Sequence, residues 1–275
     1  MSSKREQLIQ DGFCVFENVL TPEMVERTNA VSNCLLDAQD TEYFEAQKST
    51  GSLISIYNDD FFAELVTWTK ALNALREMGF DHPTFSSGYI ISKPPHSPPL
   101  FWHQDWWGWN DPISYEPLPQ QVFLMYYLVN TSRENGCLRL IEGSHLNRHP
   151  LHDITPEAHT EDLRRVSDPD HPAYQSYPDE RDVPVRAGDL VIGDSRLLHS
   201  AHANKTDQRR TVITLWYHPI YNELPDGMRA RLANRHPIPD HWSEEATRKI
   251  APLMPIYKGD CEELEWNRIP GPALV

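Results

Sequence analysis

The sequence predicts a mainly β protein with flanking helices, built as a sandwich or a barrel. Between about residues 86 and 217 the chain is a series of short apolar runs, among them GYIIS, QVFLMYYLV, DLVIGD and RRTVITLWYH, separated by Pro, Gly, Asn and Asp. Two segments before residue 80 instead repeat apolar residues at three- and four-residue steps. Helices that lead into many short strands are typical of a β core flanked by helices. We expect one domain over residues 1–275, with its β core at about 84–218.

The two helical segments lie within residues 21–79. The first begins at TPEMVERTNAV, where Thr21 is suited to cap the helix, Pro22 to its first position and Glu23 to its first turn. The second, DDFFAELVTWTKALNALREMG, predicts one continuous helix that ends at Gly79. A further helix is expected in YNELPDGMRARLANRH, and the proline-rich tail after it is expected to lie on the surface.

Residues 147–183 show no apolar period and are rich in His, Pro, Asp and Arg. Loops of this length in compact domains are usually functional lids or disordered segments. We therefore expect a long loop between strands, partly mobile, that becomes ordered over a pocket when substrate binds.

Composition and charge exclude several kinds of partner. The formal net charge of -15 disfavours nucleic acid and anionic membranes, because binding to either depends on clustered Lys and Arg. No run approaches the roughly 18 apolar residues of a membrane span, and the start, MSSKREQLIQDG, is polar. We expect a soluble, cytoplasmic monomer or homodimer. The cysteines lack CxxC spacing and are expected to be buried free thiols: Cys14, Cys34, Cys137 and Cys261.

The stretch LFWHQDWWGW, residues 100–109, contains a candidate metal-binding pair. In a strand, residues two apart project to the same side, so His103 and Asp105 are expected to point together. Two histidines and one carboxylate on one face hold non-heme Fe(II) with open positions, so a third ligand must come from elsewhere. Alone, a His-x-Asp pair is more often solvated or part of a hydrogen-bonded turn.

A longer stretch, GDLVIGDSRLLHSAHANKTDQRRTVITLWYH, adds to this pattern. Together with HQD and ENGCLRLIEGSH it resembles the phytanoyl-CoA dioxygenase family of Fe(II)/2-oxoglutarate-dependent oxygenases, and the likeness extends from DGFCVFENVLTPEMVE to about Tyr217. The resemblance implies a double-stranded β-helix core, which is a jelly roll of the cupin type. It also implies Fe(II), 2-oxoglutarate and O2 as cofactor and co-substrates.

The resemblance also implies the metal ligands and an anchor for 2-oxoglutarate. Family members carry the HxD pair, a distal histidine, and an arginine eleven residues beyond that histidine. Counting from His199 reaches Arg210, whereas counting from His202 reaches Ile213, so the spacing selects His103, Asp105 and His199 as ligands. The Arg210 guanidinium offers two parallel donors to the distal carboxylate of 2-oxoglutarate. His202 and Arg209 are expected to be solvated neighbours.

Two further positions match family residues that contact 2-oxoglutarate, namely Tyr89 and Met125, although each could equally be a plain core residue. Some relatives have a serine two residues beyond the distal histidine that helps to bind the carboxylate, but this chain has Ala201 there. Arg210 would then depend on another hydroxyl, for which Tyr89 is the candidate.

The tryptophans around HxD suggest the surroundings of the site. Strand alternation sends Trp102 and Trp106 to the opposite face, whereas Trp107 and Trp109 lie beyond the motif. At least one of Trp106, Trp107 and Trp109 is expected to line the substrate mouth, where aromatic walls suit a flat, hydrophobic or cationic substrate. Trp102 is as well suited to packing. In GSH, Ser144 and His145 are interpreted as structural.

The predicted reaction is hydroxylation of a C–H bond in a small molecule, such as a secondary metabolite or an amino-acid-like or lipid-like compound, with release of succinate and CO2. Related halogenases replace the carboxylate ligand by a small residue, whereas this chain keeps Asp105. Desaturation, cyclisation and epimerisation remain open as outcomes of the same chemistry. A barrel that binds without catalysis is a further alternative, which the complete set His103, Asp105, His199 and Arg210 disfavours.

Overall fold

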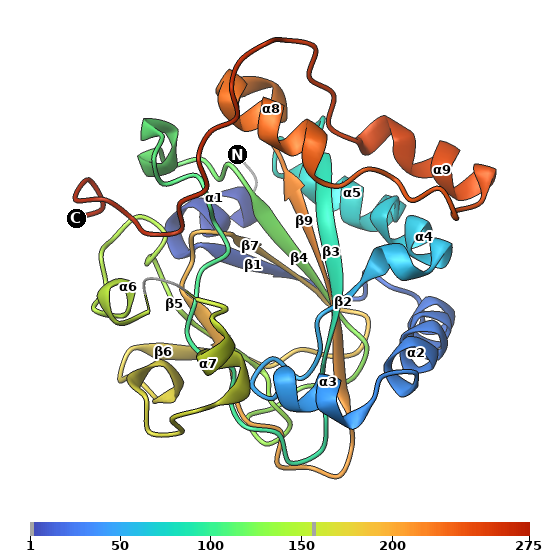
Figure 1. The fold of residues 1–275 in the computed structure, drawn as a ribbon, viewed down its shortest axis with the longest axis vertical. Helices are drawn as coiled ribbons and strands as arrows, with labels where there is room; N and C mark the ends of the chain where they lie inside the picture. Colours follow the sequence, from blue (N-terminus) through green and yellow to red (C-terminus); the bar gives the residue numbers. More distant parts are fainter. Residues whose placement is uncertain (1–2, 156–157) are drawn as a thin grey trace.

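The computed structural model describes residues 3–155 and 158–275, and its core consists of two antiparallel sheets. The larger sheet is six-stranded, in the order β1-β7-β4-β9-β3-β2, and the smaller is three-stranded, in the order β6-β5-β8 (Figure 1). The strands are β1 Phe13–Phe16, β2 Ile54–Ser55, β3 Thr84–Lys93, β4 Val122–Tyr127, β5 Leu138–Ile141, β6 Glu180–Val183, β7 Leu190–Asp194, β8 His199–Ala201 and β9 Arg210–His218. The expected mainly β architecture with flanking helices is confirmed.

The two faces of the large sheet bury different side chains because residues along a strand alternate. On β9, Ile213, Leu215 and Tyr217 belong to a cluster beneath the helices, whereas Val212 packs in the cluster between the two sheets. Figure 1 places α2, α4, α5 and α9 together on one side of the large sheet. The helices are α1 Ser3–Asp11, α2 Pro22–Asp37, α3 Thr41–Ala46, α4 Ala63–Val66, α5 Thr69–Glu77, α6 Leu151–Ile154, α7 Glu161–Arg165, α8 Asp226–Arg235 and α9 Glu244–Ile250.

The N-terminal helices agree with the sequence in part. Oγ1 of Thr21 accepts a hydrogen bond of 3.2 Å from the backbone N–H of Met24, so the expected cap of α2 is confirmed. The expected continuous helix up to Gly79 is wrong, because the chain leaves the helical path between α4 and α5 at Trp68 (ψ 113°). The indole of Trp68 donates to the carbonyl of Val19 at 2.8 Å. A tertiary contact therefore overrides a helical pattern that spans the break.

The segment 147–183 contains more structure than its sequence indicates. It includes α6, α7 and β6, and β6 pairs with β5 along its whole length. Elements of four or five residues are too short to produce a period, which is why the sequence predicts a plain loop. The expected lid includes residues 156–157, which lie outside the described residues, and its closure stays a prediction.

The C-terminal part of the chain does more than cover the surface. The helix expected after Tyr221 is present as α8. The tail beyond α9 pairs with the HxD segment through a bridge between Asn267 and Gly108, and Leu264, Trp266 and Leu274 pack on its tryptophans. The tail therefore brings residues such as Trp266 to the same region as Asp105.

The cysteines are free, as expected, but their burial is not uniform. Cys14 and Cys137 are buried, whereas Cys34 and Cys261 are exposed, so the expectation of four buried thiols is wrong for two of them. Among residues 3–155 and 158–275, no helix has both the length and the apolar character needed to cross a membrane.

Candidate active site

The HxD segment is extended but does not form a regular strand, which corrects the expectation from the sequence. A single antiparallel bridge joins His103 to His199, with backbone hydrogen bonds of 3.0 and 2.9 Å in the two directions. Directly opposed residues in such a pair carry their side chains on the same face. The two imidazole rings accordingly lie with centroids 4.2 Å apart. The backbone therefore brings together two histidines that are far apart in sequence.

Asp105 completes a group of three buried side chains. Its Oδ1 lies 3.7 Å from Nε2 of His103, and its Oδ2 lies 3.7 Å from Nε2 of His199. The three residues are only 5, 7 and 2% exposed in the order His103, Asp105, His199. One carboxylate thus faces two imidazole nitrogens, an arrangement that suits a divalent metal.

The backbone fixes which imidazole nitrogens face Asp105. Nδ1 of His103 lies 3.0 Å from the carbonyl of Phe101, and Nδ1 of His199 lies 2.9 Å from the carbonyl of Leu197. A carbonyl can only accept, so each Nδ1 carries the proton and each Nε2 keeps its lone pair for a metal. Burial and the neighbouring His199 lower the pKa of His103 to about 3, which keeps the ring neutral, as a metal ligand must be.

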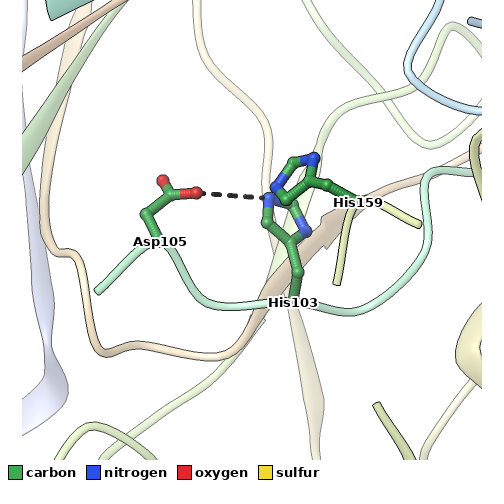
Figure 2. A group of neighbouring side chains, drawn as sticks. All are labelled: His103, Asp105 and His159. Atoms are coloured by element: carbon green, nitrogen blue, oxygen red, sulfur yellow. Dashed lines mark ion pairs between the residues drawn. The ribbon is translucent and has the colours of Figure 1, made fainter. Parts of the chain in front are cut away.

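A third histidine, which the sequence did not indicate, approaches the same point. Ligand atoms of His103, Asp105 and His159 lie within 4.8 Å of one another (Figure 2). The ring of His159 is 4.9 Å from that of His103 and 5.1 Å from that of Phe101. Burial lowers the pKa of His159 well below its usual value. The residue lies between α6 and α7, in a segment whose many histidines have no informative spacing.

Strand β9 supplies one wall of an inner cavity of about 60 Å³ next to this group. Its residues at two-residue steps line the cavity: Arg210, Val212, Thr214 and Trp216. At one end of this row, Nε1 of Trp216 donates a hydrogen bond of 2.9 Å to Oδ2 of Asp105. At the other end is Arg210, which is 3% exposed. The strand therefore runs from the proposed metal side to a buried guanidinium.

Buried polar atoms of this cavity lack hydrogen-bond partners among the described residues. Nε of Arg210 and Oγ1 of Thr214 are buried and make no hydrogen bond to any described residue. A buried donor left in this state is costly unless a ligand satisfies it. Burial lowers the pKa of Arg210, and burial together with Arg210 lowers the pKa of Lys93, which pairs with it across β3 and β9. The donor set fits a small dicarboxylate such as 2-oxoglutarate.

The two other residues expected beside 2-oxoglutarate have different positions. Met125 lines the inner cavity. Tyr89 instead lines a second, outer cavity of about 240 Å³, where its ring lies 5.9 Å from that of Trp216. The hydroxyl that faces the Arg210 cavity from this pair of strands belongs to Thr214, the register partner of Tyr89. The alternation RxVxTxW that begins at Arg210 in the sequence already indicates that Thr214 shares a face of the strand with Arg210.

His202 and Arg209, which the eleven-residue spacing did not select, lie apart from the group of His103, Asp105 and His199. Arg209 points to the surface, where it forms an ion pair of 2.9 Å with Asp37 of α2. His202 is not solvated as expected, since it is 8% exposed and its Nε2 lies 2.6 Å from Oδ1 of Asp182. His145 is fully buried and its Nε2 donates to the carbonyl of Ile9, which agrees with a structural role.

Of the three tryptophans expected near the substrate, only Trp107 lines the outer cavity. Trp106 and Trp109 are buried, and their indoles donate to Ser114 and Gln104 respectively. Trp102 is fully buried, with the guanidinium of Arg139 4.7 Å from its ring centroid. Packing in the protein interior therefore accounts for Trp102, Trp106 and Trp109 around HxD.

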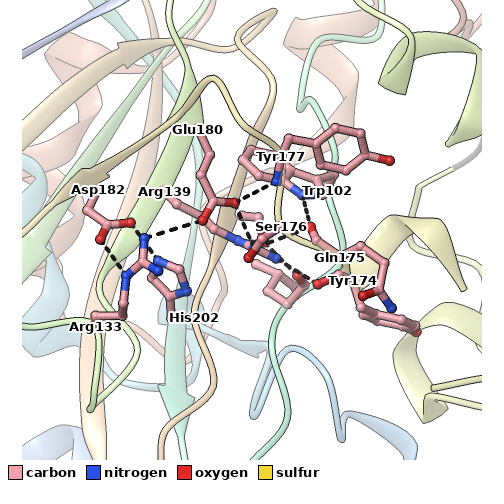
Figure 3. Close-up of polar contacts among 12 residues, drawn as sticks. Trp102, Arg133, Arg139, Tyr174, Gln175, Ser176, Tyr177, Glu180, Asp182 and His202 are labelled. Carbon is pink, nitrogen blue, oxygen red and sulfur yellow. Dashed lines mark hydrogen bonds and ion pairs between the residues drawn. The ribbon is translucent and has the colours of Figure 1, made fainter. Parts of the chain in front are cut away.

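Arg139 ties the site to the segment that follows α7 (Figure 3). From β5 it donates to Oγ of Ser200 at 3.1 Å, to the carbonyl of Tyr174 at 3.0 Å, and to Glu180 at 3.0 Å. Ser200 follows His199 directly and in turn donates to the carbonyl of Leu100 at 2.6 Å. One buried arginine thus joins β8, the start of the HxD segment and residues 174–180.

Comparisons of the sequence with known proteins identify its family. A model of the phytanoyl-CoA dioxygenase (PhyH) family matches residues 8–212. An ectoine dioxygenase of Nocardia farcinica (strain IFM 10152) is 25% identical over 241 residues, which cover 80% of this chain and 78% of that protein.

Solved structures share the fold. The epimerase SnoN in complex with Fe3+, alpha-ketoglutarate and nogalamycin RO superposes with a TM-score of 0.60 at 19% identity, covering 97% of this chain and 96% of that one. HygX from Streptomyces hygroscopicus with nickel and 2-oxoglutarate bound gives a TM-score of 0.59 at 20% identity, covering 80% and 87%. The chain belongs to the phytanoyl-CoA dioxygenase family and is an Fe(II)/2-oxoglutarate-dependent dioxygenase.

Proposed function

We propose that the protein hydroxylates a C–H bond of a small-molecule substrate, with His103, Asp105 and His199 as the iron ligands. The observation that carries this assignment is the backbone bridge between His103 and His199, which sets two imidazoles against one buried carboxylate. Iron bound by such a triad, together with 2-oxoglutarate and O2, supplies an oxidant for C–H bonds while 2-oxoglutarate leaves as succinate and CO2.

The inner cavity is proposed as the seat of 2-oxoglutarate. Arg210 binds the carboxylate that is remote from the metal, and the hydroxyl of Thr214 adds one hydrogen bond to it. Both side chains have buried polar atoms that form no hydrogen bond with the described residues, which leaves them available to a ligand. Met125 contributes an apolar wall to this cavity. Trp216 orients the Asp105 carboxylate, and Tyr89 contacts the primary substrate in the outer cavity.

Hydroxylation is favoured over halogenation because Asp105 keeps its carboxylate in the position that a halide would need. Desaturation, cyclisation and epimerisation are distinguished from it by product mass. A hydroxylated product gains an oxygen atom, a desaturated or cyclised one loses two hydrogens, and an epimer keeps the mass of the substrate. We propose that residues 1–275 act as one catalytic domain. The monomer or homodimer and the cytoplasmic location stay predictions.

Metal analysis of purified protein tests the ligand assignment. We expect one iron per chain in the wild type and strongly reduced iron in His103→Ala, Asp105→Ala and His199→Ala, with 2-oxoglutarate-dependent succinate release lost in all three. His202→Ala is the matched control, because this nearby histidine binds Asp182 instead. Iron retained in His199→Ala, or lost equally in His202→Ala, would overturn the assignment.

A further inference from the structure

The outer cavity is rich in positive charge although the protein is strongly acidic. The chain has a formal net charge of -15. Three arginines nevertheless line this cavity: Arg164, Arg235 and Arg268. Among the lining residues that the structure describes, Asp105 is the one carboxylate, and its oxygens face His103 and His199. The cavity therefore has a local charge opposite to that of the whole protein.

Arg164 and Arg268 are half-buried and Arg235 is exposed, and all three differ from the buried Arg139 and Arg196, which have carboxylate partners. Arg139 pairs with Glu180 at 3.0 Å and Arg196 pairs with Asp194 at 2.6 Å. Arg164, Arg235 and Arg268 have no Asp or Glu oxygen of the described residues within 4.0 Å. The acidic neighbour of Arg235, Glu263, lies 3.6 Å from Arg231 and accepts from Asn234 instead.

Two polar atoms of these arginines also lack hydrogen-bond partners in the described part of the chain. Nε of Arg164 and Nη1 of Arg268 are buried and form no hydrogen bond with the described residues. Arg164 comes from α7, Arg235 from the last turn of α8, and Arg268 from the C-terminal tail. Partial burial lowers the pKa of both Arg235 and Arg268, with Arg268 half-buried and Arg235 exposed at the cavity mouth. Holding such groups together is costly unless an anion compensates them.

The aromatic walls of the outer cavity disfavour a cationic ligand. Trp107 and Trp266 are stacked, with centroids 5.3 Å apart and an interplanar angle of 5°. The guanidinium of Arg235 lies 3.9 Å from the centroid of Trp266, and that of Arg268 lies 5.3 Å from it. The ring of Trp266 is thus already in contact with two protein cations, which disfavour a substrate cation beside it. Tyr89 and Trp216 remain as flat walls close to Asp105.

We propose that the primary substrate is a small organic anion whose charged group binds Arg235 and Arg268 at the mouth of the outer cavity. Its apolar body lies against Trp216 and Tyr89, which directs a C–H bond toward the group of His103, Asp105 and His199. A volume of about 240 Å³ suits a compound of one or two rings. This inference rests on the proposed function, because it places the substrate beside the proposed metal ligands. Carboxylates, sulfonates and phosphonates share the required chemistry.

Matched probes test the charge preference directly. Calorimetry is performed without O2, on protein alone and on protein loaded with Fe(II) and 2-oxoglutarate. The probes are indole-3-acetate, indole-3-acetamide and tryptamine, which vary the charge on one ring system, and phenylacetate, benzenesulfonate and phenylphosphonate, which vary the anion. We expect the acids to bind at least about tenfold more tightly than the neutral amide, as charge-assisted hydrogen bonds would produce, and the amine to bind most weakly.

Variants identify the groups responsible. Arg235→Gln and Arg268→Gln should each lose the preference for acid over amide. Arg235→Gln should keep wild-type affinities for Fe(II) and 2-oxoglutarate. Arg231→Gln is the matched control, since Arg231 is on the same helix as Arg235 but is bound to Glu263. Thermal unfolding of each variant verifies that it is folded.

The outcomes distinguish failure of the anionic-substrate inference from failure of the proposed function. Equal binding of acid and amide, tighter binding of the amine, no binding of any acid at millimolar concentration, or an equal loss in Arg231→Gln would overturn the anionic substrate. Weakened 2-oxoglutarate binding in Arg268→Gln, with the acid preference intact, would instead assign Arg268 to the co-substrate. Absence of Fe(II) and 2-oxoglutarate binding in the wild type would refute the proposed function, while the acid preference of the protein alone could still be measured.

Discussion

Nε1 of Trp216 lies 2.9 Å from Oδ2 of Asp105 and donates a hydrogen bond to it. Trp216 is on the same face of β9 as Arg210 and Thr214, and all three line the inner cavity. One strand therefore orients the proposed carboxylate ligand at one end and presents the proposed co-substrate anchor at the other. Because a strand rises by a fixed distance per residue, β9 sets the distance between the proposed metal site at Asp105 and the proposed anchor Arg210.

Loss of this hydrogen bond should weaken metal binding. Trp216→Phe keeps an aromatic wall but removes the indole N–H, so the Asp105 carboxylate is oriented less strongly. Substitutions of groups that orient metal ligands cost roughly 10- to 100-fold in metal affinity, and we expect an effect of that size here. Titration of the metal-free protein with Fe(II) without O2 measures it. Trp107→Phe, which alters another tryptophan of the outer cavity, should bind Fe(II) as the wild type does; equal losses in both variants would contradict the prediction.

Residues that share a motif or a strand could be predicted from the sequence. The HxD pair rests on local spacing, whereas His199 and Arg210 follow from the eleven-residue step that the family resemblance implies, and the structure brings these residues to one cavity. Thr214 and Trp216 were missed, although two-residue steps from Arg210 reach both. The run RRTVITLWYH therefore contains two site residues, Thr214 and Trp216, in addition to the predicted Arg210.

Residues brought in by tertiary contacts could not be predicted. His159, Arg164 and Arg268 come from short helices, their connections and the tail, where no period marks which side chain turns inward. The same limit explains the break between α4 and α5. The contact of Trp68 with Val19 depends on a segment 49 residues away, which periodicity within one helix cannot report.

The anchor for 2-oxoglutarate is tested by a substitution that keeps its charge. Arg210→Lys loses the two-pronged geometry, so the KM for 2-oxoglutarate should rise more than that for the primary substrate. A charge-assisted pair lost in a buried site costs on the order of 2 to 3 kcal/mol, or roughly thirtyfold to hundredfold in affinity. Steady-state kinetics or calorimetry measures the change.

Arg209→Lys is the control for this substitution, because Arg209 pairs with Asp37 on the surface. It should change neither constant. A sensitive Arg209 and a tolerant Arg210 would be incompatible with the register of β9, in which Arg210 is opposite Lys93.

The hydroxyl of Thr214 should contribute to the same anchor. Thr214→Val preserves shape and removes the buried hydroxyl, so 2-oxoglutarate should bind about three- to tenfold more weakly, as expected for one net hydrogen bond. Thr211→Val, on the opposite face of β9, removes a hydrogen bond of 2.7 Å to Ser92 instead. That control should lower stability without changing the affinity for 2-oxoglutarate. If Thr214→Val binds 2-oxoglutarate normally, the hydroxyl faces the cavity without using it.

The buried Arg139 should stabilise the fold much more than the exposed Arg133. Arg139→Met removes the buried ion pair of 3.0 Å with Glu180 and leaves Glu180 with the longer contact of 3.5 Å to Arg133, and breaking a buried pair in this way costs about 3 to 5 kcal/mol of unfolding free energy. Arg133→Met removes ion pairs of 2.8 Å to Asp182 and 3.5 Å to Glu180, but the Arg133 side chain is 57% exposed. Its loss should cost at most about 1 kcal/mol. Urea unfolding measures both values, and similar costs would refute the contrast.

Acid should destabilise the fold in part through His218. Burial lowers the pKa of this histidine from 6.5 to about 4, and in the neutral ring Nδ1 donates to the carbonyl of Gln120 at 2.9 Å. Because the folded pKa lies below the unfolded value, the unfolded chain binds more protons between these pH values, so stability is full above pH 6.5 and falls as the pH drops toward 4. The loss from this group should be about 2 kcal/mol between about pH 7 and pH 5. His218→Asn retains a donor for Gln120 but cannot titrate, so the difference in unfolding free energy between wild type and variant should shrink by that amount on acidification. If the unfolding free energies of the two proteins fall in parallel as the pH drops, His218 is not responsible for the loss of stability in acid.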